Sequence, residues 1–428
     1  MSALYGVGLL ALLCLGMPVA ASLLIVAAAG VLLAAVPLSI VAERLAFGLD
    51  NFTLIAIPMF LLMGNLMNAS GITQRIFDFA VAMVGHWRGG LAQVNILGSM
   101  VFSGMSGSAL ADAAGLGTVE IRAMVQKGYT PAFAAAITAA SATVGPVIPP
   151  STVAVLYAYI ADVSVGRMFV AGVIPGLMMV AVQMLIVHWR GLKIVGQSFP
   201  RAGTAERIAT TWRALPALVC PFILMGGMRV GVFTPTELAA VGVAYALVLA
   251  LVYHAETSRE GMVAAFRDTA LSTGSIMLIV AAANVFAWIL ARERIPQAVT
   301  EAVLAMGVEP WMLLILLNLL LLLLGMVLDT AGILILVTPV VVPAVVAVGI
   351  DPVHFGMVMI VNMMIGLLTP PVGMALFIVS DIAKVPLTAV VREVLPFIGG
   401  FLVVLALITF IPELVLILPD LVYGAATP

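Results

Sequence analysis

The sequence predicts an all-α polytopic membrane protein. This interpretation rests on its composition, on the length of its apolar segments and on an internal repeat. Hydrophobic residues fill 64% of the 428 positions and charged residues only 9%, whereas a soluble domain carries about 25% charged residues. The composition therefore excludes a water-soluble globular enzyme and a disordered chain. The formal net charge of −2 argues against nucleic acid as a partner, because phosphate binding needs a concentrated basic face.

The apolar segments give the second observation. A helix that crosses a bilayer needs about 20 apolar residues. The first apolar run continues past Ala20 to Pro37 without the basic start of a cleavable signal peptide. We expect it to form two short helices, broken near Gly16 and Pro18. Further apolar segments are predicted at 52–70, 90–104, 108–126, 130–161, 166–189, 212–228, 235–253, 270–291, 311–328, 330–349, 353–384 and 394–418.

The basic residues predict the orientation of these segments. Five Lys and Arg lie between residues 188 and 214, against one acid, so the positive-inside rule places this loop in the cytoplasm. The other basic loops can share that side only if 90–126 and 311–349 are re-entrant hairpins, each of which enters and leaves on one face. Of the 18 Lys and Arg, 13 then lie inside; the exceptions are Arg44, Arg167, Arg229, Arg292 and Arg294.

An internal repeat is the third observation. A shift of 221 residues aligns two halves of the chain without a gap, and the predicted topology makes the halves inverted. Chance explains matched alanines in this composition, but it explains a shared register of glycines and prolines poorly. Inverted repeats with broken helices are typical of secondary transporters whose site lies at mid-membrane. The matches pair Gly104-Met105 with Gly325-Met326, Pro131 with Pro352, Gly145 with Gly366, Pro149-Pro150 with Pro370-Pro371, Ala154 with Ala375 and Pro175 with Pro396.

Four segments interrupt the helical pattern inside apolar sequence. Residues 103–108 form the first tip, between the arms of hairpin one, and residues 145–151 form the first break, with three prolines in five residues. Residues 325–332 form the second tip and residues 366–373 the second break. Unwound backbone at membrane depth is tolerated only where it is buried in protein or lines a watery cavity. These segments therefore predict the functional site.

Each tip that faces its own break predicts one cation site, so two repeats imply two sites. Backbone carbonyls and hydroxyl oxygens are suitable ligands for a hard cation such as Na⁺. Helix capping or packing explains any single hydroxyl equally well, but it explains the four-part set poorly. The predicted cation ligands are Ser103, Gly104, Ser106, Ser108, Gly145, Pro146, Ser151, Gly325, Asp329, Thr330, Gly366, Thr369 and Gly373.

The substrate is expected to be an anion. The helices that start after each tip direct their positive dipole ends inward. Asp329 is the one acid inside a long hydrophobic stretch, which makes it a functional candidate, whereas Asp112 is interpreted as an acid that complements a helix dipole. The predicted substrate-binding residues are Ser106, Gly107, Ser108, Asp329, Thr330, Gly332 and Thr369.

Enzymatic and metal chemistry are not expected. There is no phosphate-binding loop and no paired nucleophile and base, so no catalytic residues are predicted. The four histidines are scattered without metal-ligand spacing, and Cys14 and Cys220 lie far apart in apolar runs. No transition metal and no cofactor is therefore expected, apart from Na⁺ as a coupling ion.

At these motifs the sequence resembles the large membrane subunit of the tripartite ATP-independent periplasmic (TRAP) transporters, over essentially its whole length. The resemblance implies an inverted-repeat ion-transporter-type fold with two re-entrant hairpins and two broken helices, in which a transport domain moves against a scaffold as an elevator. It further implies Na⁺-coupled uptake of an organic acid anion, a dicarboxylate, sialic acid or similar carboxylate, across the bacterial inner membrane. The most specific segments are 57–60, 102–108, 145–151, 325–329 and 369–373.

The resemblance also implies two protein partners, one within the lipid bilayer and one outside it. One is a small four-helix membrane subunit, expected as a separate chain because residues before 52 leave no room for it. The other is a periplasmic substrate-binding protein, which selects the substrate in this family. The expected division is an N-terminal scaffold and arm (1–88), a first transport repeat (89–165), a central scaffold (166–310) with a cytoplasmic loop at about 189–211, a second transport repeat (311–385) and a C-terminal scaffold helix (386–428).

Four alternatives remain open from the residues. The main one is a stand-alone ion-coupled anion transporter of the same superfamily, which shares the tips and breaks but needs no binding protein. A passive channel is disfavoured by closed tips at mid-membrane. An intramembrane enzyme lacks a nucleophile and its base, and a purely structural subunit does not account for four breaks, each of which costs stability.

Overall fold

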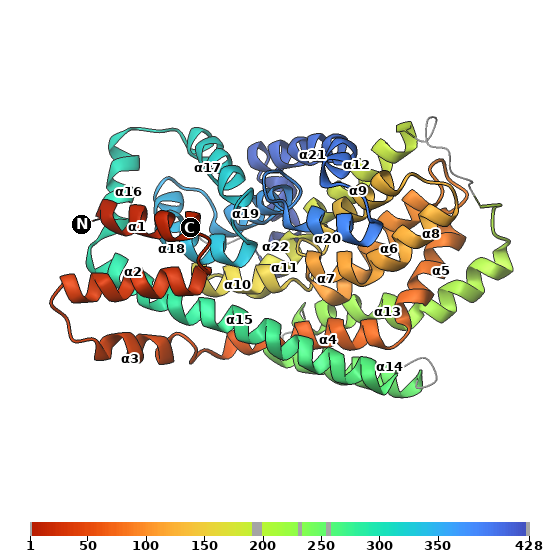
Figure 1. Cartoon of the computed structure of the whole chain (residues 1–428), viewed down its shortest axis with the longest axis horizontal. Helices are drawn as coiled ribbons and strands as arrows, with labels where there is room; N and C mark the ends of the chain where they lie inside the picture. Colours follow the sequence, from red (N-terminus) through yellow and green to blue (C-terminus); the bar gives the residue numbers. More distant parts are fainter. Residues whose placement is uncertain (1, 191–198, 230–232, 254–257, 425–428) are drawn as a thin grey trace.

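The computed structural model describes residues 2–190, 199–229, 233–253 and 258–424, and every regular element in these ranges is a helix (Figure 1). The elements are α1 (Ser2–Cys14), α2 (Val19–Leu33), α3 (Ser39–Phe47), η1 (Phe52–Ile55), α4 (Ala56–Ala69), α5 (Ile72–Val84), α6 (Leu91–Ser106), α7 (Ala109–Ala114), α8 (Leu116–Gln126), α9 (Pro131–Ala142), α10 (Thr152–Ala161), α11 (Val165–Ala171), α12 (Val173–Arg190), α13 (Thr204–Arg229), α14 (Pro235–Val252), α15 (Arg259–Arg292), α16 (Ile295–Ala305), α17 (Pro310–Gly325), α18 (Thr330–Ala347), α19 (Pro352–Gly366), α20 (Met374–Ala383), α21 (Leu387–Phe410) and α22 (Glu413–Tyr423).

Seven helical segments of the described ranges are long and apolar enough to cross a membrane, and shorter apolar helices accompany them. Together they confirm the predicted all-α polytopic membrane protein. The seven segments are Phe52–Ala69, Val165–Arg190, Thr204–Met228, Pro235–Val252, Arg259–Arg292, Thr330–Ala347 and Leu387–Phe410.

The predicted break in the first apolar run is confirmed. Helix α1 ends at Cys14, Gly16 has a positive φ of 78°, and Pro18 precedes the first residue of α2. Glycine reaches this left-handed conformation without steric cost, and proline cannot continue the preceding helix. The two residues therefore separate α1 from α2.

Several predicted segments differ from the observed helices. Segment 166–189 is divided at Gly172, which packs closely against the carbonyl of Val147, and segment 394–418 is divided before Pro412. Helices α3, α5 and α16 lie in segments predicted only as connections, because they are too short or too polar to be recognised as spans. The predicted cytoplasmic loop at 189–211 is shorter than expected, since α13 already begins at Thr204; residues 191–198 of that loop lie outside the described ranges.

The helix bounds confirm the 221-residue repeat. A shift of 221 moves α9 from 131–142 to 352–363, inside α19, and moves α10 from 152–161 to 373–382, which overlaps α20. The same shift moves α5 to 293–305, which contains α16. The span of α7 and α8 together, 109–126, moves to 330–347, the bounds of α18. The two halves therefore share the order of their helices and, within a few residues, the bounds of these pairs.

One difference between the halves is a helix break at Gly115. The sequence predicts a single arm over 108–126, but the backbone of Gly115 has φ −80° and ψ −88°, and it separates α7 from α8. A Cβ atom at this position would lie 2.7 Å from Nδ2 of Asn68 in α4. Glycine therefore permits the close approach of α4 at a point where α18, its counterpart, continues unbroken.

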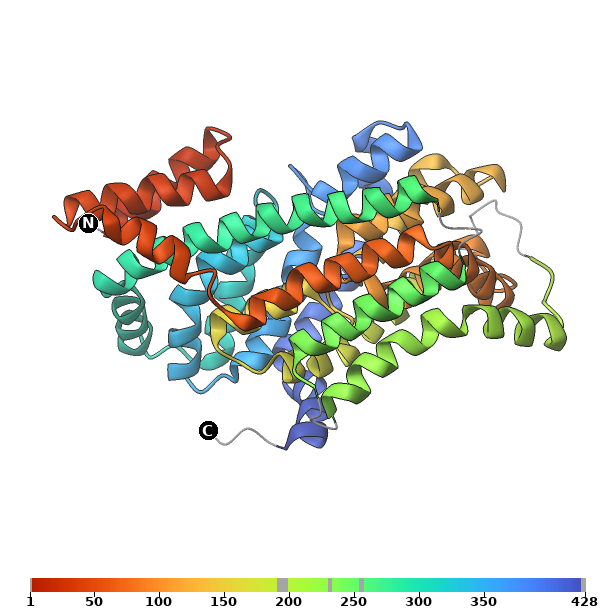
Figure 2. The ribbon, with the colours of Figure 1, turned by 90° about the horizontal axis from the view of Figure 1, so that it is seen from below.

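The long helices α4, α13, α14 and α15 run alongside one another on one side of the molecule (Figure 2). Helix α4 packs against both α14 and α15, and α13 packs against α5, α6 and α14. The helices that carry the tips and breaks, including α7, α10, α18 and α20, lie on the other side of this layer in Figure 1. The boundary between the two groups is where the cavity described next is found.

Candidate functional site

A cavity of about 650 Å³ lies between the long-helix layer and the tips. Its walls come from segments far apart in the sequence: both tips, the first break, Leu367 of the second break, and helices α4 and α15. The predicted site residues among its lining are Ser108, Pro146, Asp329 and Thr330. The structure thus brings the two halves of the repeat to one cavity.

The first tip and the first break are in direct contact. Gly107 ends α6 with a positive φ of 58°, and a Cβ atom there would lie 2.5 Å from the carbonyl oxygen of Pro150. The hydroxyl of Thr152 donates to the carbonyl of Gly107 over 3.3 Å. Only glycine allows this approach, because a side chain would displace the break and is disfavoured at this φ.

Two serines cap the helices that start at this contact. Ser108 precedes α7 and its Oγ accepts from the amide of Ala111 over 3.4 Å. Ser151 precedes α10, is 1% exposed, accepts from the amide of Ala154 over 3.0 Å and donates to the carbonyl of Pro146. In this conformation the hydroxyl of Ser151 already has two protein partners, whereas Ser108 borders the cavity.

The remaining residues of the first set take different positions. Ser103 is buried in α6 and donates to the carbonyl of Ser99 over 2.6 Å. Gly104 faces the ring of Pro221 in α13, and Gly145 lies in the break beside the backbone of Ser108. Ser106 is the last residue of α6, and its side chain lies outside the described part of the structure.

The second tip and the second break also meet, backbone against backbone. Gly325 ends α17, Gly366 ends α19, and a Cβ atom on Gly366 would lie 2.7 Å from the Cα of Gly325. The amide of Val372 donates to the carbonyl of Met326 over 3.2 Å. Tip and break are therefore held together in both halves.

Asp329 begins α18 at the cavity. Its side chain is half-buried and accepts from the amide of Gly332 over 3.1 Å, which makes it the N-cap of the helix. Thr330 is the first residue of α18 and borders the same cavity. Gly332 leaves room for the carboxylate, since a Cβ atom there would lie 2.8 Å from Oδ1 of Asp329.

Thr369 and Gly373 lie in the second break, outside the cavity lining. The hydroxyl of Thr369 donates to the carbonyl of Ile365 over 2.7 Å. Gly373 has a positive φ of 53°, which places its backbone near the carbonyls of Thr369 and Leu367 and starts α20. The carbonyl of Leu367 accepts from the amide of Ala375 over 3.3 Å.

Sequence reasoning missed the wall contributed by the long helices. Asn65 and Asn68 of α4 border the cavity, and Asn65 donates to the hydroxyl of Thr269 in α15 over 2.8 Å. The part of this wall that α15 contributes is polar at helical spacing, because residues 268, 272 and 275 share one face of the helix. This helical spacing of polar residues is visible in the sequence and could have indicated the wall. The residues of this wall are Asp268, Ser272 and Ser275.

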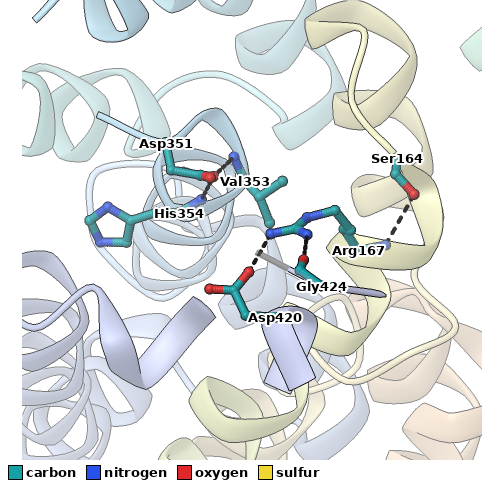
Figure 3. A network of polar contacts seen from close by, with 7 residues as sticks. All are labelled: Ser164, Arg167, Asp351, Val353, His354, Asp420 and Gly424. Atoms are coloured by element: carbon teal, nitrogen blue, oxygen red, sulfur yellow. Dashed lines mark hydrogen bonds and ion pairs between the residues drawn. The ribbon is translucent and has the colours of Figure 1, made fainter. Parts of the chain in front are cut away.

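A second polar network lies apart from the cavity (Figure 3). Arg167 of α11, predicted as an exception to the positive-inside rule, donates to Asp420 of α22 over 2.6 Å and to the carbonyl of Gly424 over 2.6 Å. Close by, Asp351 caps α19 by accepting from the amides of Val353 and His354. This network fixes the C-terminal helix to α11.

The chain matches known proteins over nearly its whole length. Residues 7–414 match the family described as "Tripartite ATP-independent periplasmic transporter, DctM component". The chain is 44% identical over 418 residues to the sialic acid TRAP transporter large permease protein SiaM of Vibrio cholerae, covering 97% of this chain and 98% of that protein. It is 39% identical over 371 residues to the C4-dicarboxylate TRAP transporter large permease protein DctM of Pseudomonas aeruginosa, covering 87% of each.

The fold is also similar to a solved structure. The crystal structure of the YdaH transporter of Alcanivorax borkumensis superimposes with a TM-score of 0.64 over 86% of each chain, at 15% sequence identity. At this identity the likeness concerns the fold alone.

Proposed function

The chain belongs to the DctM component family of the tripartite ATP-independent periplasmic transporters, and from this premise we propose that it is the large permease of a Na⁺-coupled importer of an organic acid anion. The observation that carries the proposal is the cavity itself. Both tips, the first break and the long-helix layer meet there, and its 650 Å³ suits a small anion rather than a macromolecule.

The charge distribution at the cavity supports an anionic substrate together with cations. Helices α10 and α18 begin at the cavity, and their amide ends attract negative charge. Asp329 places a carboxylate at the same cavity. This carboxylate would repel a carboxylate substrate unless cations were bound nearby. Na⁺ held by the backbone oxygens of the tips and breaks would remove this repulsion. Ion binding and substrate binding would then favour each other.

We assign the cation positions to the two contacts between tip and break. The first contact contains Ser103, Gly104, Ser106, Ser108, Gly145, Pro146 and Ser151, and the second contains Gly325, Asp329, Thr330, Gly366, Thr369 and Gly373. The substrate would bind beside them, against Gly107, Ser108, Asp329, Thr330 and Gly332. Of these residues, Ser108, Pro146, Asp329 and Thr330 border the cavity.

The proposed movement is an elevator in which α6–α10 and α17–α20 move as one block against the long helices. The position of the cavity supports it, because the cavity is bounded by the block on one side and by α4 and α15 on the other. Gly104 of the block packs on Pro221 of α13, and small residues at a helix contact allow close sliding. The proposed partners are a small membrane subunit and a periplasmic binding protein, in the bacterial inner membrane.

Uptake in proteoliposomes tests the proposal. The chain is reconstituted with its small subunit, and the cognate binding protein is added outside with radiolabelled sialic acid or a C4-dicarboxylate. We expect accumulation of one of these acids that needs an inward Na⁺ gradient and stops when the gradient is collapsed. Accumulation that is indifferent to Na⁺ would refute the coupling, and equal uptake without the binding protein would favour a stand-alone transporter.

A further inference from the structure

Two acidic side chains are buried inside hairpin one, away from the proposed cation contacts. Asp112 of α7 and Glu120 of α8 are each 1% exposed. In the described part of the chain, neither carboxyl group forms a hydrogen bond or an ion pair. The Ser99 hydroxyl faces Asp112 without reaching hydrogen-bond geometry. A buried carboxylate without a partner is energetically costly, so each of these groups requires an explanation.

The fold makes room for the carboxyl group of Glu120. A Cβ atom at Gly98 of α6 would lie 2.8 Å from Oε1 of Glu120. The absence of a side chain at residue 98 therefore creates the space that the carboxyl group occupies. Gly117, one turn earlier in α8, brings the helix against Thr138 of α9 in the same way.

The surroundings of Glu120 contain no basic partner. Helix α8 packs against α6, α7, α9 and α20. Helices α6 and α9 carry no charged residue, and α7 carries only Asp112. The one acid of α20, Asp381, is exposed and bonded to Lys384 over 2.9 Å, and Arg122 of α8 itself points to the surface. Nothing described here offsets a negative charge on Glu120.

A chain of hydrogen bonds leads from α9 toward the acids. Asn95 donates to the hydroxyl of Thr138 over 2.7 Å and accepts from Ser141 over 2.6 Å. The hydroxyl of Ser99 donates to that of Ser141 over 3.1 Å, and Ser99 faces Asp112. Hydroxyl groups act both as donors and as acceptors, so such a chain can adjust to the gain or loss of a proton.

The buried acids belong to the first repeat alone. The shift of 221 residues replaces Asp112 by Ile333 and Glu120 by Val341. It also replaces Asn95, Ser99 and Thr138 by Leu316, Leu320 and Met359. Of the cluster, only Ser141 keeps a polar counterpart, Asn362. The buried acids and the other polar side chains are therefore not a requirement of the repeated fold, because the second copy packs their positions with apolar side chains.

We propose that Glu120, with Asp112 beside it, is a proton-binding site inside hairpin one. A proton from water adds to a carboxylate oxygen of Glu120, forms an O–H bond and removes the unit negative charge that burial disfavours. Release of the proton restores a charge that only water or movement of α8 can accommodate, so proton occupancy is linked to the packing of hairpin one. The site is inferred from geometry alone, and its link to transport rests on the proposed function.

Infrared spectroscopy of the purified full-length chain tests the site directly. At neutral pH we expect a C=O band from a protonated carboxyl group, and we expect Glu120→Gln to lose that band. Glu206→Gln, which changes an exposed glutamate at the start of α13, is the matched control and should leave the band unchanged. If Glu120→Gln does not fold, Gly98→Ala should shift the band, because its methyl group would press on Oε1. A band that neither variant alters would refute the proposal.

The pH dependence of uptake tests the link to transport. The wild-type rate of Na⁺-driven uptake should change across the pH range in which the infrared band of Glu120 disappears, and the Glu120→Gln rate should be flat across that range. Identical pH profiles for the two proteins would disprove the link. Absence of Na⁺-driven uptake by the wild type would refute the proposed function, while the infrared result would still decide the proton site.

Discussion

Gly325 and Gly366 touch through their backbones, at the ends of α17 and α19, with no side chain between them. Their repeat partners, Gly104 and Gly145, do not touch in the same way: Gly104 faces Pro221, and Gly145 lies beside Ser108. The equivalent glycines of the two halves therefore make different contacts. In the second half they join tip to break, and in the first half one of them forms the contact with the long-helix layer.

The Gly325–Gly366 contact leads to the first prediction. Gly366→Ala places a methyl group 2.7 Å from the Cα of Gly325, so the tip must separate from the break at a cost of about 1–3 kcal/mol. We expect the Na⁺ concentration for half-maximal uptake to rise by about tenfold or more. Gly399→Ala in α21 is the control, because no atom lies within 4 Å of the added methyl group. Equal Na⁺ dependence in both variants would contradict the assignment of this contact to a cation.

Asp329 gives the second prediction. Asp329→Asn keeps an oxygen that can cap α18 but removes the charge, and Asp329→Ala removes both. We expect both variants to lose Na⁺-dependent uptake, and only Asp329→Ala to lose about 1 kcal/mol of stability, measured by thermal unfolding in detergent. The control is Asp351→Asn, which changes the aspartate that caps α19 away from the cavity and should retain uptake. Normal uptake by Asp329→Asn would remove this charge from the mechanism.

The third prediction concerns Gly104 and Pro221. Gly104→Ala creates a clash with the ring of Pro221 in the conformation described here. If Gly104 acts through this packing, uptake by Gly104→Ala should fall by about tenfold, and the Pro221→Ala change should restore it. If Gly104 acts only through its carbonyl oxygen as a cation ligand, the second substitution will give no rescue. Uptake rates of the two single variants and the double variant distinguish the cases.

The fourth prediction concerns Arg167 and Asp420. Their 2.6 Å ion pair is partly buried, with the Arg167 side chain 13% exposed, so the pair should contribute more than a surface pair. We expect Arg167→Ala to lower the free energy of unfolding by about 1–3 kcal/mol. A double-mutant cycle with Asp420→Ala isolates the coupling between the two side chains. If the losses of unfolding free energy are additive, the interaction between the two side chains does not contribute to stability.

Residue types with strong backbone preferences were enough to predict the outline of the fold. Pro146, Pro149 and Pro150 cannot continue a helix, and the structure ends α9 before them and begins α10 after them. The glycine and proline register also predicted the repeat that the helix bounds confirm. The contact of each tip with its break followed from this register, and it is observed at Gly107 and at Gly366.

Features that depend on partners distant in the chain were not predictable. Glycine is tolerated inside a helix, so the break at Gly115 depends on Asn68, which lies 47 residues earlier. Two of the arginines that depart from the positive-inside pattern have partners distant in the chain. Arg44 lies 5.7 Å from the ring of Trp288, and Arg167 binds Asp420. The burial of Glu120 likewise depends on the space left by Gly98.

The length of helix α15 bears on how deep in the membrane the cavity lies. Its 34 residues span about 51 Å at about 1.5 Å each, well beyond a hydrocarbon thickness of about 30 Å. The helix must therefore tilt or extend beyond the hydrocarbon region. Its charged first turns, with Arg259 and Arg267, belong among the lipid headgroups. Asp268, only nine residues from the start of the helix, then stands near the headgroup layer. Because Asp268 also lines the cavity, the cavity extends toward that headgroup layer.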